Sequence, residues 1–384
     1  MTEARLGPKT SEMSLVDKLG RVSRGLVILT AVIACIGFGM LYSAADGNME
    51  PWASRQIFRF MVGLVLVLVI AVVDIRIWMQ SAYLIYALAL STLVAVETFG
   101  FIGMGAQRWI YLGWFQLQPS ELMKIALVMA LARYFHSTAL DDARRPILLV
   151  IPVLMVLAPI GLVLRQPDLG TAVMLVVGAG AVFFVSGVAI RYFLIGGAIA
   201  VSAVPIAWQF LQGYQRERIL TFLNPEADPL GAGYHILQSK IALGSGGLFG
   251  RGFMHGTQSH LNFLPEHQTD FIFTMLAEEL GLVGALVLLL LYLFLFAYGF
   301  AISLRSRNHF GRLLGIGLTT TLFLYVFINI AMVTGLIPVV GIPLPLISYG
   351  GTAMMTVLFS LGLLMCIFVH RDERLTRTPG IDAA

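Results

Sequence analysis

The sequence predicts an all-α polytopic membrane protein with about ten transmembrane helices. Hydrophobic residues make up 58% of the 384 residues and charged residues only 12%, about half of the charged share of a soluble domain. The mean hydropathy is +0.86. Apolar runs near 20 residues recur along the chain, and about 20 residues cross roughly 30 Å of hydrocarbon. A surface of this composition must face lipid.

Ten apolar runs account for the expected helices in order. The first is too long for a cleavable signal peptide and is followed by no clean small-residue cleavage site. The fifth and sixth are separated only by Arg165-Gln166-Pro167-Asp168. The expected spans lie near residues 25–45, 54–74, 77–99, 119–135, 146–164, 169–188, 191–212, 271–303, 312–336 and 345–369.

Lysine and arginine are divided unevenly between the two sides of this bundle. Sixteen of the 25 fall in the termini and the loops on the same side, and nine fall on the opposite side. The positive-inside rule therefore predicts that both termini are cytoplasmic. The net charge of +4 reflects this topology and does not indicate binding to nucleic acid.

The expected organisation is a cytoplasmic tail over 1–24, one transmembrane domain over 25–370 and a second cytoplasmic tail over 371–384. Polar residues gather in a large outer loop at about 213–269, between the seventh and eighth helices, and in smaller loops at about 99–118 and 336–344. Because loops on a rigid scaffold often carry function, long outer loops favour a function outside the membrane.

The large loop has internal order. Its segment Leu220–Pro229 reads as turns around two prolines, and Tyr234–Leu243 predicts a short amphipathic helix suited to the bilayer interface. The glycine-rich Gly244–Gly252 follows. It is interpreted either as a flexible loop at the membrane surface or as a loop that aims backbone N–H groups at a phosphate.

Charged residues near the outer helix ends are the candidate site. Pro119 fits the first turn of a helix, and Glu121 and Lys124 share a face at i, i+3. Charges at this depth normally face a bundle interior or a wet cavity, so the pair is either a self-neutralising structural element or part of a site. Arg108, next to Trp109, is either an interfacial anchor or a site residue.

Asp270 stands at the outer entry of the eighth helix, where a carboxylate is costly without a partner or a function. Glu278 and Glu279 lie two turns further in, and at least one is expected to make a helix–helix hydrogen bond or to pair with a cation. Three histidines lie in the same loop, but their spacings match no zinc signature; they are His255, His260 and His267.

Three stretches together resemble the SEDS family of cell-wall glycosyltransferases. They read QPSELMK at 118–124, LNFLPEHQTDFIF at 261–273 and GIPLPLISYGG at 341–351. The resemblance runs from Asp17 through the tenth helix, and the stretch 256–266 is most similar to the family member that acts in cell elongation. The usual family pattern Glu-x-His-Thr-Asp has glutamine here in place of its histidine, at Gln268, so the role of that histidine has no counterpart.

The resemblance implies polymerisation of lipid II by transfer from an undecaprenyl diphosphate donor to the 4-hydroxyl of an acceptor GlcNAc. Asp270 matches the catalytic aspartate of the family and would act as general base. A divalent cation, Mg²⁺ or Mn²⁺, or basic side chains would stabilise the leaving diphosphate. The residues expected to bind substrate are Arg108, Glu121, Lys124, Gln268, Arg216, Lys240 and Ser348.

The resemblance further implies location in the bacterial cytoplasmic membrane with an active site that faces the periplasm. It implies a class B penicillin-binding protein as partner, with other elongation-complex proteins and membrane lipids around it. The small residues of 281–285 and 311–317 are expected to receive the partner's helix. Two other functions stay open: a lipid II flippase, which needs a polar path through both leaflets, and a non-catalytic scaffold, for which Asp270 is dispensable.

Overall fold

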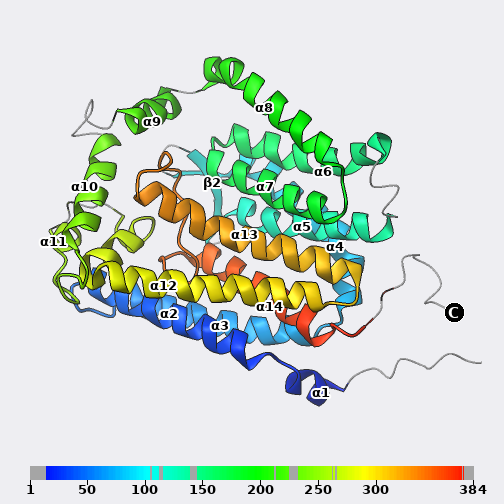
Figure 1. Cartoon of the computed structure of the whole chain (residues 1–384), viewed down its shortest axis with the longest axis horizontal. Helices are drawn as coiled ribbons and strands as arrows, with labels where there is room; N and C mark the ends of the chain where they lie inside the picture. The colour runs from blue at the N-terminus through cyan, green and yellow to red at the C-terminus, as the bar shows by residue number, and fades with distance from the viewer. Residues whose placement is uncertain are drawn as a thin grey trace, which may run out of the picture.

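The protein is a bundle of long helices (Figure 1). Its computed structural model describes residues 14–103, 106–111, 116–138, 145–211, 213–224, 232–261, 263, 266–373 and 375. Ten helices of 17 to 34 residues form the bundle within these ranges: α2 (Arg24–Ala44), α3 (Ala53–Val72), α4 (Ile75–Phe99), α5 (Pro119–Ser137), α6 (Pro146–Arg165), α7 (Leu169–Val185), α8 (Ile190–Phe210), α12 (Ile272–Arg305), α13 (His309–Val333) and α14 (Gly351–Val369).

Short elements connect them. They are α1 (Leu15–Gly20), α9 (Gly213–Leu223), α10 (Ala232–Ser245), α11 (Thr257–His260) and the strands β1 (Phe101–Gly103), β2 (Ala106–Tyr111) and β3 (Gln116–Leu117). The three strands form one antiparallel sheet in the order β1-β2-β3, which the sequence had suggested only as a loop. The helix expected at 234–243 is α10. The turns expected from Leu220 onward are wrong for residues 220–223, because these residues are the last turn of α9.

The ten expected spans match the ten long helices of the described residues. Seven are long and apolar enough to cross a membrane by length and composition, and α7 and α8 contain shorter apolar stretches. One boundary is wrong: the tenth helix begins at Gly351 and not near residue 345. The preceding residues form turns, with Leu346 at φ +66°, a left-handed conformation that a helix cannot contain.

The bundle has two different ends (Figure 1). We call the end with α1 and residue 373 the terminal end, where Lys18 donates to the carbonyl of Val72 (3.0 Å) and the backbone N–H of Arg307 to that of Arg371 (2.9 Å). We call the opposite end, with the sheet, α9–α11 and residues 334–350, the loop end. Eleven described members of the larger basic set lie toward the terminal end, as expected: Lys18, Arg21, Arg24, Arg76, Arg133, Arg145, Arg191, Arg305, Arg307, Arg312 and Arg371.

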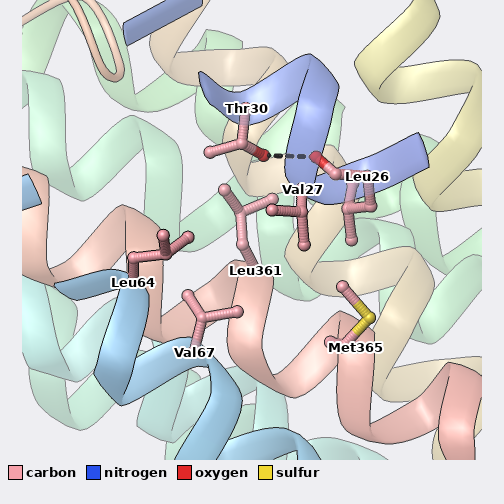
Figure 2. Close-up of a pocket in the computed structure, with 7 residues that line it drawn as sticks. All are labelled: Leu26, Val27, Thr30, Leu64, Val67, Leu361 and Met365. Atoms are coloured by element: carbon pink, nitrogen blue, oxygen red, sulfur yellow. Dashed lines mark hydrogen bonds between the residues drawn. The ribbon is translucent and has the colours of Figure 1, made fainter. Parts of the chain in front are cut away.

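The core is built around α13, which packs against α5, α7, α12 and α14. Helices α3 and α14 pack closely at Gly63, which has no side chain. A Cβ at that position would lie 2.1 Å from Cδ1 of Leu358. Helix α8 lies at the edge of the bundle (Figure 1) and exposes apolar side chains such as Leu194 and Val201. A cavity of about 10 Å³ between α2, α3 and α14 has a mainly aliphatic lining, and the Thr30 hydroxyl is bonded to the Leu26 carbonyl (Figure 2). It is too small and apolar to hold a ligand or an ordered water.

Helix α12 is interrupted at Gly281, whose φ of +68° and ψ of −167° are not helical. The glycine-rich loop replaces the lost helical hydrogen bonds. The N–H groups of Arg251 and Gly252 donate to the carbonyls of Glu278 and Glu279, and those of Leu282 and Val283 donate to the carbonyls of Gly247 and Leu248. A backbone break inside a membrane protein is tolerated where other protein groups satisfy its polar atoms.

The hydrogen bonds between the glycine-rich loop and α12 are incompatible with a flexible loop or a phosphate-binding loop for the N–H groups of residues 250–252. The N–H groups of Gly250, Arg251 and Gly252 all donate to backbone carbonyls of the chain, so they are not available to a phosphate. The break also divides α12 into a buried first part, 272–280, and a span of residues 282–305, about 36 Å at 1.5 Å per residue. Asp270 therefore lies beyond the membrane span, at the start of the buried part.

We expect Gly281→Ala to destabilise the protein by several kcal/mol, because a Cβ there would lie 2.3 Å from the backbone N of Gly250 in a left-handed conformation. The measurement is the free energy of unfolding in detergent or lipid. Gly180→Ala is the matched control: its Cβ meets nothing within 4 Å on a regular helix, so that variant should be neutral or slightly stabilised. Equal stability of both variants would contradict this account of the break.

One of the two small-residue stretches expected to receive a partner helix, 311–317, is already packed within the chain. A Cβ on Gly315 would lie 2.2 Å from Oγ of Ser303, and one on Gly317 would lie 2.4 Å from Cγ1 of Val128. The expectation for 311–317 is therefore wrong: small residues do permit close helix packing, but here they pack within the chain.

Candidate functional site

The backbone around Asp270 is held from α13. The side-chain amide of Asn329 donates to the carbonyl of Asp270 (2.9 Å) and to that of Ile342 (2.7 Å). The Asp270 carboxylate faces the turn at Gly341, where an added Cβ would lie 3.3 Å from Oδ2. Asp270 itself is half-buried, so its carboxylate is positioned by the fold and still partly accessible.

The segment 344–350 folds back into the loop end and supports the chain just before Asp270. The hydroxyl of Ser348 donates to the carbonyl of Thr269 (2.6 Å) and accepts from the N–H of Leu344 (2.7 Å). The N–H of Tyr349 donates to the carbonyl of Gln268 (2.9 Å). Ser348 is thus buried and its hydroxyl is used within the protein, while the side chain of Gln268 is half-buried.

Glu121 and Lys124 form a buried ion pair inside the bundle. Nζ of Lys124 lies 2.7 Å from Oε1 of Glu121, and each residue is 3% exposed. Tyr325 from α13 completes the group: its hydroxyl donates to Glu121, and its ring centroid lies 4.1 Å from Nζ of Lys124. The pair faces the bundle interior, as its spacing and depth predict.

One helix connects this ion pair to the aspartate. Tyr325 and Asn329 stand four residues apart on α13, on one face of the helix. The first contacts Glu121 and Lys124, and the second holds the backbone of Asp270. Sequence reasoning did not identify either residue, although an asparagine inside an apolar span was a usable signal, because such polar groups are costly in a membrane without a partner.

Arg108 reaches the same region from the sheet. Its guanidinium donates to the carbonyls of Gln166 (3.0 Å) and Pro167 (2.6 Å). The next residue, Asp168, caps α7 by accepting from the N–H and the hydroxyl of Thr171. Arg108 therefore lies at the loop end, where its guanidinium holds the turn between α6 and α7.

Two expected substrate-binding residues lie on the large loop. Lys240 is exposed on α10, with its Cε over Gly335 at the end of α13. Helix α10 is docked there by Ser239, whose hydroxyl donates to the carbonyl of Val333 (2.7 Å). Arg216, on α9, instead donates to the carbonyls at the end of α8, and no hydrogen bond or ion pair described for it connects it to Asp270.

The remaining acids and histidines have mainly structural contacts. Glu279 accepts from the hydroxyl of Ser43 on α2 (2.6 Å), the helix–helix bond expected for one of these acids. Glu278 accepts from the N–H groups of Thr257 and Gln258 (2.8 and 3.0 Å) and caps α11. His267 is buried edge-on against Trp52. Among the described residues, no group of three or more His, Cys, Asp or Glu is placed to hold a metal ion.

We expect Asn329→Leu to loosen the segment around Asp270, because two buried carbonyls lose their amide donor, at about 1–3 kcal/mol. Hydrogen exchange of residues 268–272 should accelerate, and the free energy of unfolding should fall. Asn48→Ala is the control, since that exposed asparagine donates one bond, to the carbonyl of Ala45. Unchanged exchange in the Asn329 variant would show that this amide does not hold the site.

These features define a polytopic membrane protein with a positioned carboxylate beyond one end of its spans and a buried ion pair connected to it through α13. The chain belongs to the FtsW/RodA/SpoVE family of cell cycle proteins, whose pattern matches residues 23–373. It is 44% identical over 358 residues to the peptidoglycan glycosyltransferase MrdB of Escherichia coli K12, covering 92% of this chain and 95% of that one. It is 36% identical to stage V sporulation protein E of Bacillus subtilis, covering 88% and 95%.

Solved structures agree with this assignment. A chain from a study of how a peptidoglycan synthase complex coordinates polymerization and crosslinking superposes with a TM-score of 0.80 at 34% identity, over 92% of this chain and 99% of that chain. The crystal structure of the rod shape determining protein RodA of Thermus thermophilus gives a TM-score of 0.70 at 31% identity, over 92% and 98%.

Proposed function

We propose that this protein is a peptidoglycan glycosyltransferase that polymerises lipid II into glycan strands during cell elongation. The observation that carries the proposal is the placement of Asp270, whose backbone Asn329 holds at the start of the buried first part of α12 and whose carboxylate faces the turn at Gly341. The likeness to MrdB over nearly the whole length of both chains supports the same reaction.

Asp270 is the general base in this proposal. A sugar hydroxyl is a poor nucleophile, and it must lose its proton as it attacks the anomeric carbon of the donor. A carboxylate within hydrogen-bond reach can take that proton, a contribution of about 10²–10⁴ in rate. Forming a β linkage from an α-linked diphosphate inverts the anomeric centre, so one base is sufficient and no covalent enzyme intermediate is needed.

The diphosphate leaving group requires positive charge. In this proposal Arg108 and Lys240 supply it from the loop end, while the buried pair of Glu121 and Lys124 fixes α5 against α13. A Mg²⁺ or Mn²⁺ ion is compatible with the residues present, because such ions are commonly held by one or two carboxylates together with substrate phosphates. When bound, the ion would neutralise charge on the diphosphate, and Asp270 is the carboxylate that we propose would hold it.

The loop end faces the periplasm in this proposal, and the bundle lies in the cytoplasmic membrane of a bacterium. The described basic side chains toward the terminal end support cytoplasmic termini by the positive-inside rule. The prenyl tail of the substrate would then stay in the outer leaflet while its head group reaches Asp270.

A class B penicillin-binding protein is the proposed partner, since glycan strands must also be cross-linked. The likeness to a chain from a study of coordinated polymerization and crosslinking supports this. Because the small residues of α13 are occupied, we place the partner's helix on the exposed apolar face of α12, which includes Leu286, Leu290 and Leu293.

The test is polymerisation of purified lipid II by the protein in vesicles together with its partner, with glycan products separated by length. The alternative, a lipid II flippase, predicts transfer of labelled lipid II between leaflets without glycan products. The middle of the bundle favours the polymerase, because Leu127, Leu131 and Leu318 are buried there and the neighbouring hydroxyls of Thr319 and Thr321 are bonded to carbonyls of their own helix. Transfer without polymer would overturn the proposal.

A further inference from the structure

A shallow, mostly open depression of about 400 Å³ lies on the surface at the first turns of α3, at the loop end. Its lining, which we call the arginine cleft, consists of Ser54, Arg55, Phe58 and Arg59. None of these residues belongs to the group around Asp270, Glu121 and Lys124 described above.

The guanidinium of Arg59 lies at the N-terminus of α14, which carries a partial positive charge. Its Cζ lies 4.9 Å from the ring centroid of Tyr349, and a Cβ on Gly351 would lie 3.3 Å from it. Gly351 is the first residue of α14, and Gly350 provides no side-chain cap. The N-terminus of a helix carries a partial positive charge, so an arginine there is unfavourable unless an anion is also bound.

The described chain supplies no such anion. Neither Arg55 nor Arg59 forms an ion pair with a described carboxylate. The two arginines are four residues apart on α3, a like-charge pair that is itself destabilising. Nη1 of Arg59 is buried without a hydrogen-bond partner in the described part of the chain, and a buried unsatisfied donor is costly.

An apolar stripe continues from the cleft along the outside of α3. Phe58 is 70% exposed, and Met61, Val62 and Val65 follow on the same face, also exposed. In a membrane-spanning helix this face contacts lipid. A ligand that suits both parts has an anionic head for the arginines and a hydrocarbon tail for the stripe.

The cleft also adjoins the segment that positions Asp270. Tyr349, on which Arg59 stacks, donates its N–H to the carbonyl of Gln268 (2.9 Å), two residues before Asp270. A head group in the cleft would thus lie close to Tyr349, one residue after Ser348, which also bonds the chain before Asp270.

We propose that the arginine cleft binds the diphosphate of one of the two lipid-linked substrates of the polymerisation, with its prenyl chain along α3. This inference rests on the proposed function, because the reaction joins two molecules that each carry a lipid diphosphate. Arg59 contacts the head group, and Arg55, at the mouth of the cleft, adds charge.

Binding of farnesyl diphosphate to the purified protein tests the cleft without any need for activity. We expect Arg59→Gln to weaken binding about ten- to a hundredfold, as for loss of hydrogen bonds to a charged group, and Arg55→Gln to weaken it less. Arg59→Lys should recover part of the affinity, and Arg165→Gln, an exposed arginine at the same end of the bundle, should bind like the wild type. Equal affinity of the wild type and both cleft variants overturns the proposal.

Polymerisation assays separate substrate from membrane phospholipid as the ligand. A substrate site predicts that Arg59→Gln raises KM for lipid II more than it lowers kcat, equally in vesicles with and without phosphatidylglycerol. An effect seen only with phosphatidylglycerol would overturn the assignment to substrate. If the wild type makes no polymer at all, the proposed function fails, and the farnesyl diphosphate measurement still decides whether the cleft binds a lipid diphosphate.

Discussion

Asp270→Asn is expected to abolish glycan polymerisation while the protein still folds and inserts. Asparagine keeps the shape of the side chain but cannot accept the proton of the attacking hydroxyl, so the rate should fall by about 10²–10⁴. The backbone contacts of Asn329 with Asp270 and Ile342 do not involve the changed atoms. The measurement is the initial rate of lipid II polymerisation with the partner present.

Glu97→Gln is a suitable control, because Glu97 is an exposed acid at the same end of the bundle and pairs with Arg165 on the surface. Its rate should match the wild type, and both variants should keep the thermal stability of the parent. A normal rate from Asp270→Asn would show that Asp270 is not the general base.

Removing one member of the buried ion pair is expected to cause the largest loss of stability. Lys124→Met leaves the Glu121 carboxylate buried with only Tyr325 as its partner, and Glu121→Gln leaves the ammonium without a countercharge. Breaking a buried pair in this way costs about 3–5 kcal/mol. The free energy of unfolding in detergent or lipid is the measurement.

The double variant Glu121→Gln with Lys124→Met supplies the second half of a double-mutant cycle. Because it removes both buried charges together, it should be more stable than either single variant. Additive losses would mean that the two side chains do not act as a pair. A double variant that is stable but inactive would show that the pair also has a part in the reaction.

The spans could be predicted from the sequence because each apolar run is long enough to be diagnostic by itself. The start of α14 could not. Leu346 and Ile347 extend the apolar pattern ahead of α14. The turn that excludes residues 345–350 from the helix depends on bonds from Ser348 and Tyr349 to residues 268–269, about 80 positions earlier. The break of α12 at Gly281 is similar, since its backbone partners lie in the loop at 247–252.

The candidate site divides in the same way. Asp270 and the pair of Glu121 and Lys124 are visible in the sequence, because charged groups at such positions are costly without a purpose. Tyr325 and Asn329 are not, since their importance comes from what they contact across helices. Arg108, Lys240 and Ser348 were expected to bind substrate from the resemblance, and that role stays a prediction.

The sequence by itself determined the membrane class, the ten spans and the sidedness expected from basic residues, all of which follow from local composition and from the transfer of side chains into lipid. Only the tertiary structure decided which carboxylate pairs with Lys124 and how the glycine-rich loop satisfies the break in α12. It also decided that Arg59 stacks on Tyr349 at the start of α14. The reason is physical: these contacts join groups that are distant along the chain, and each depends on a backbone path that no local pattern specifies.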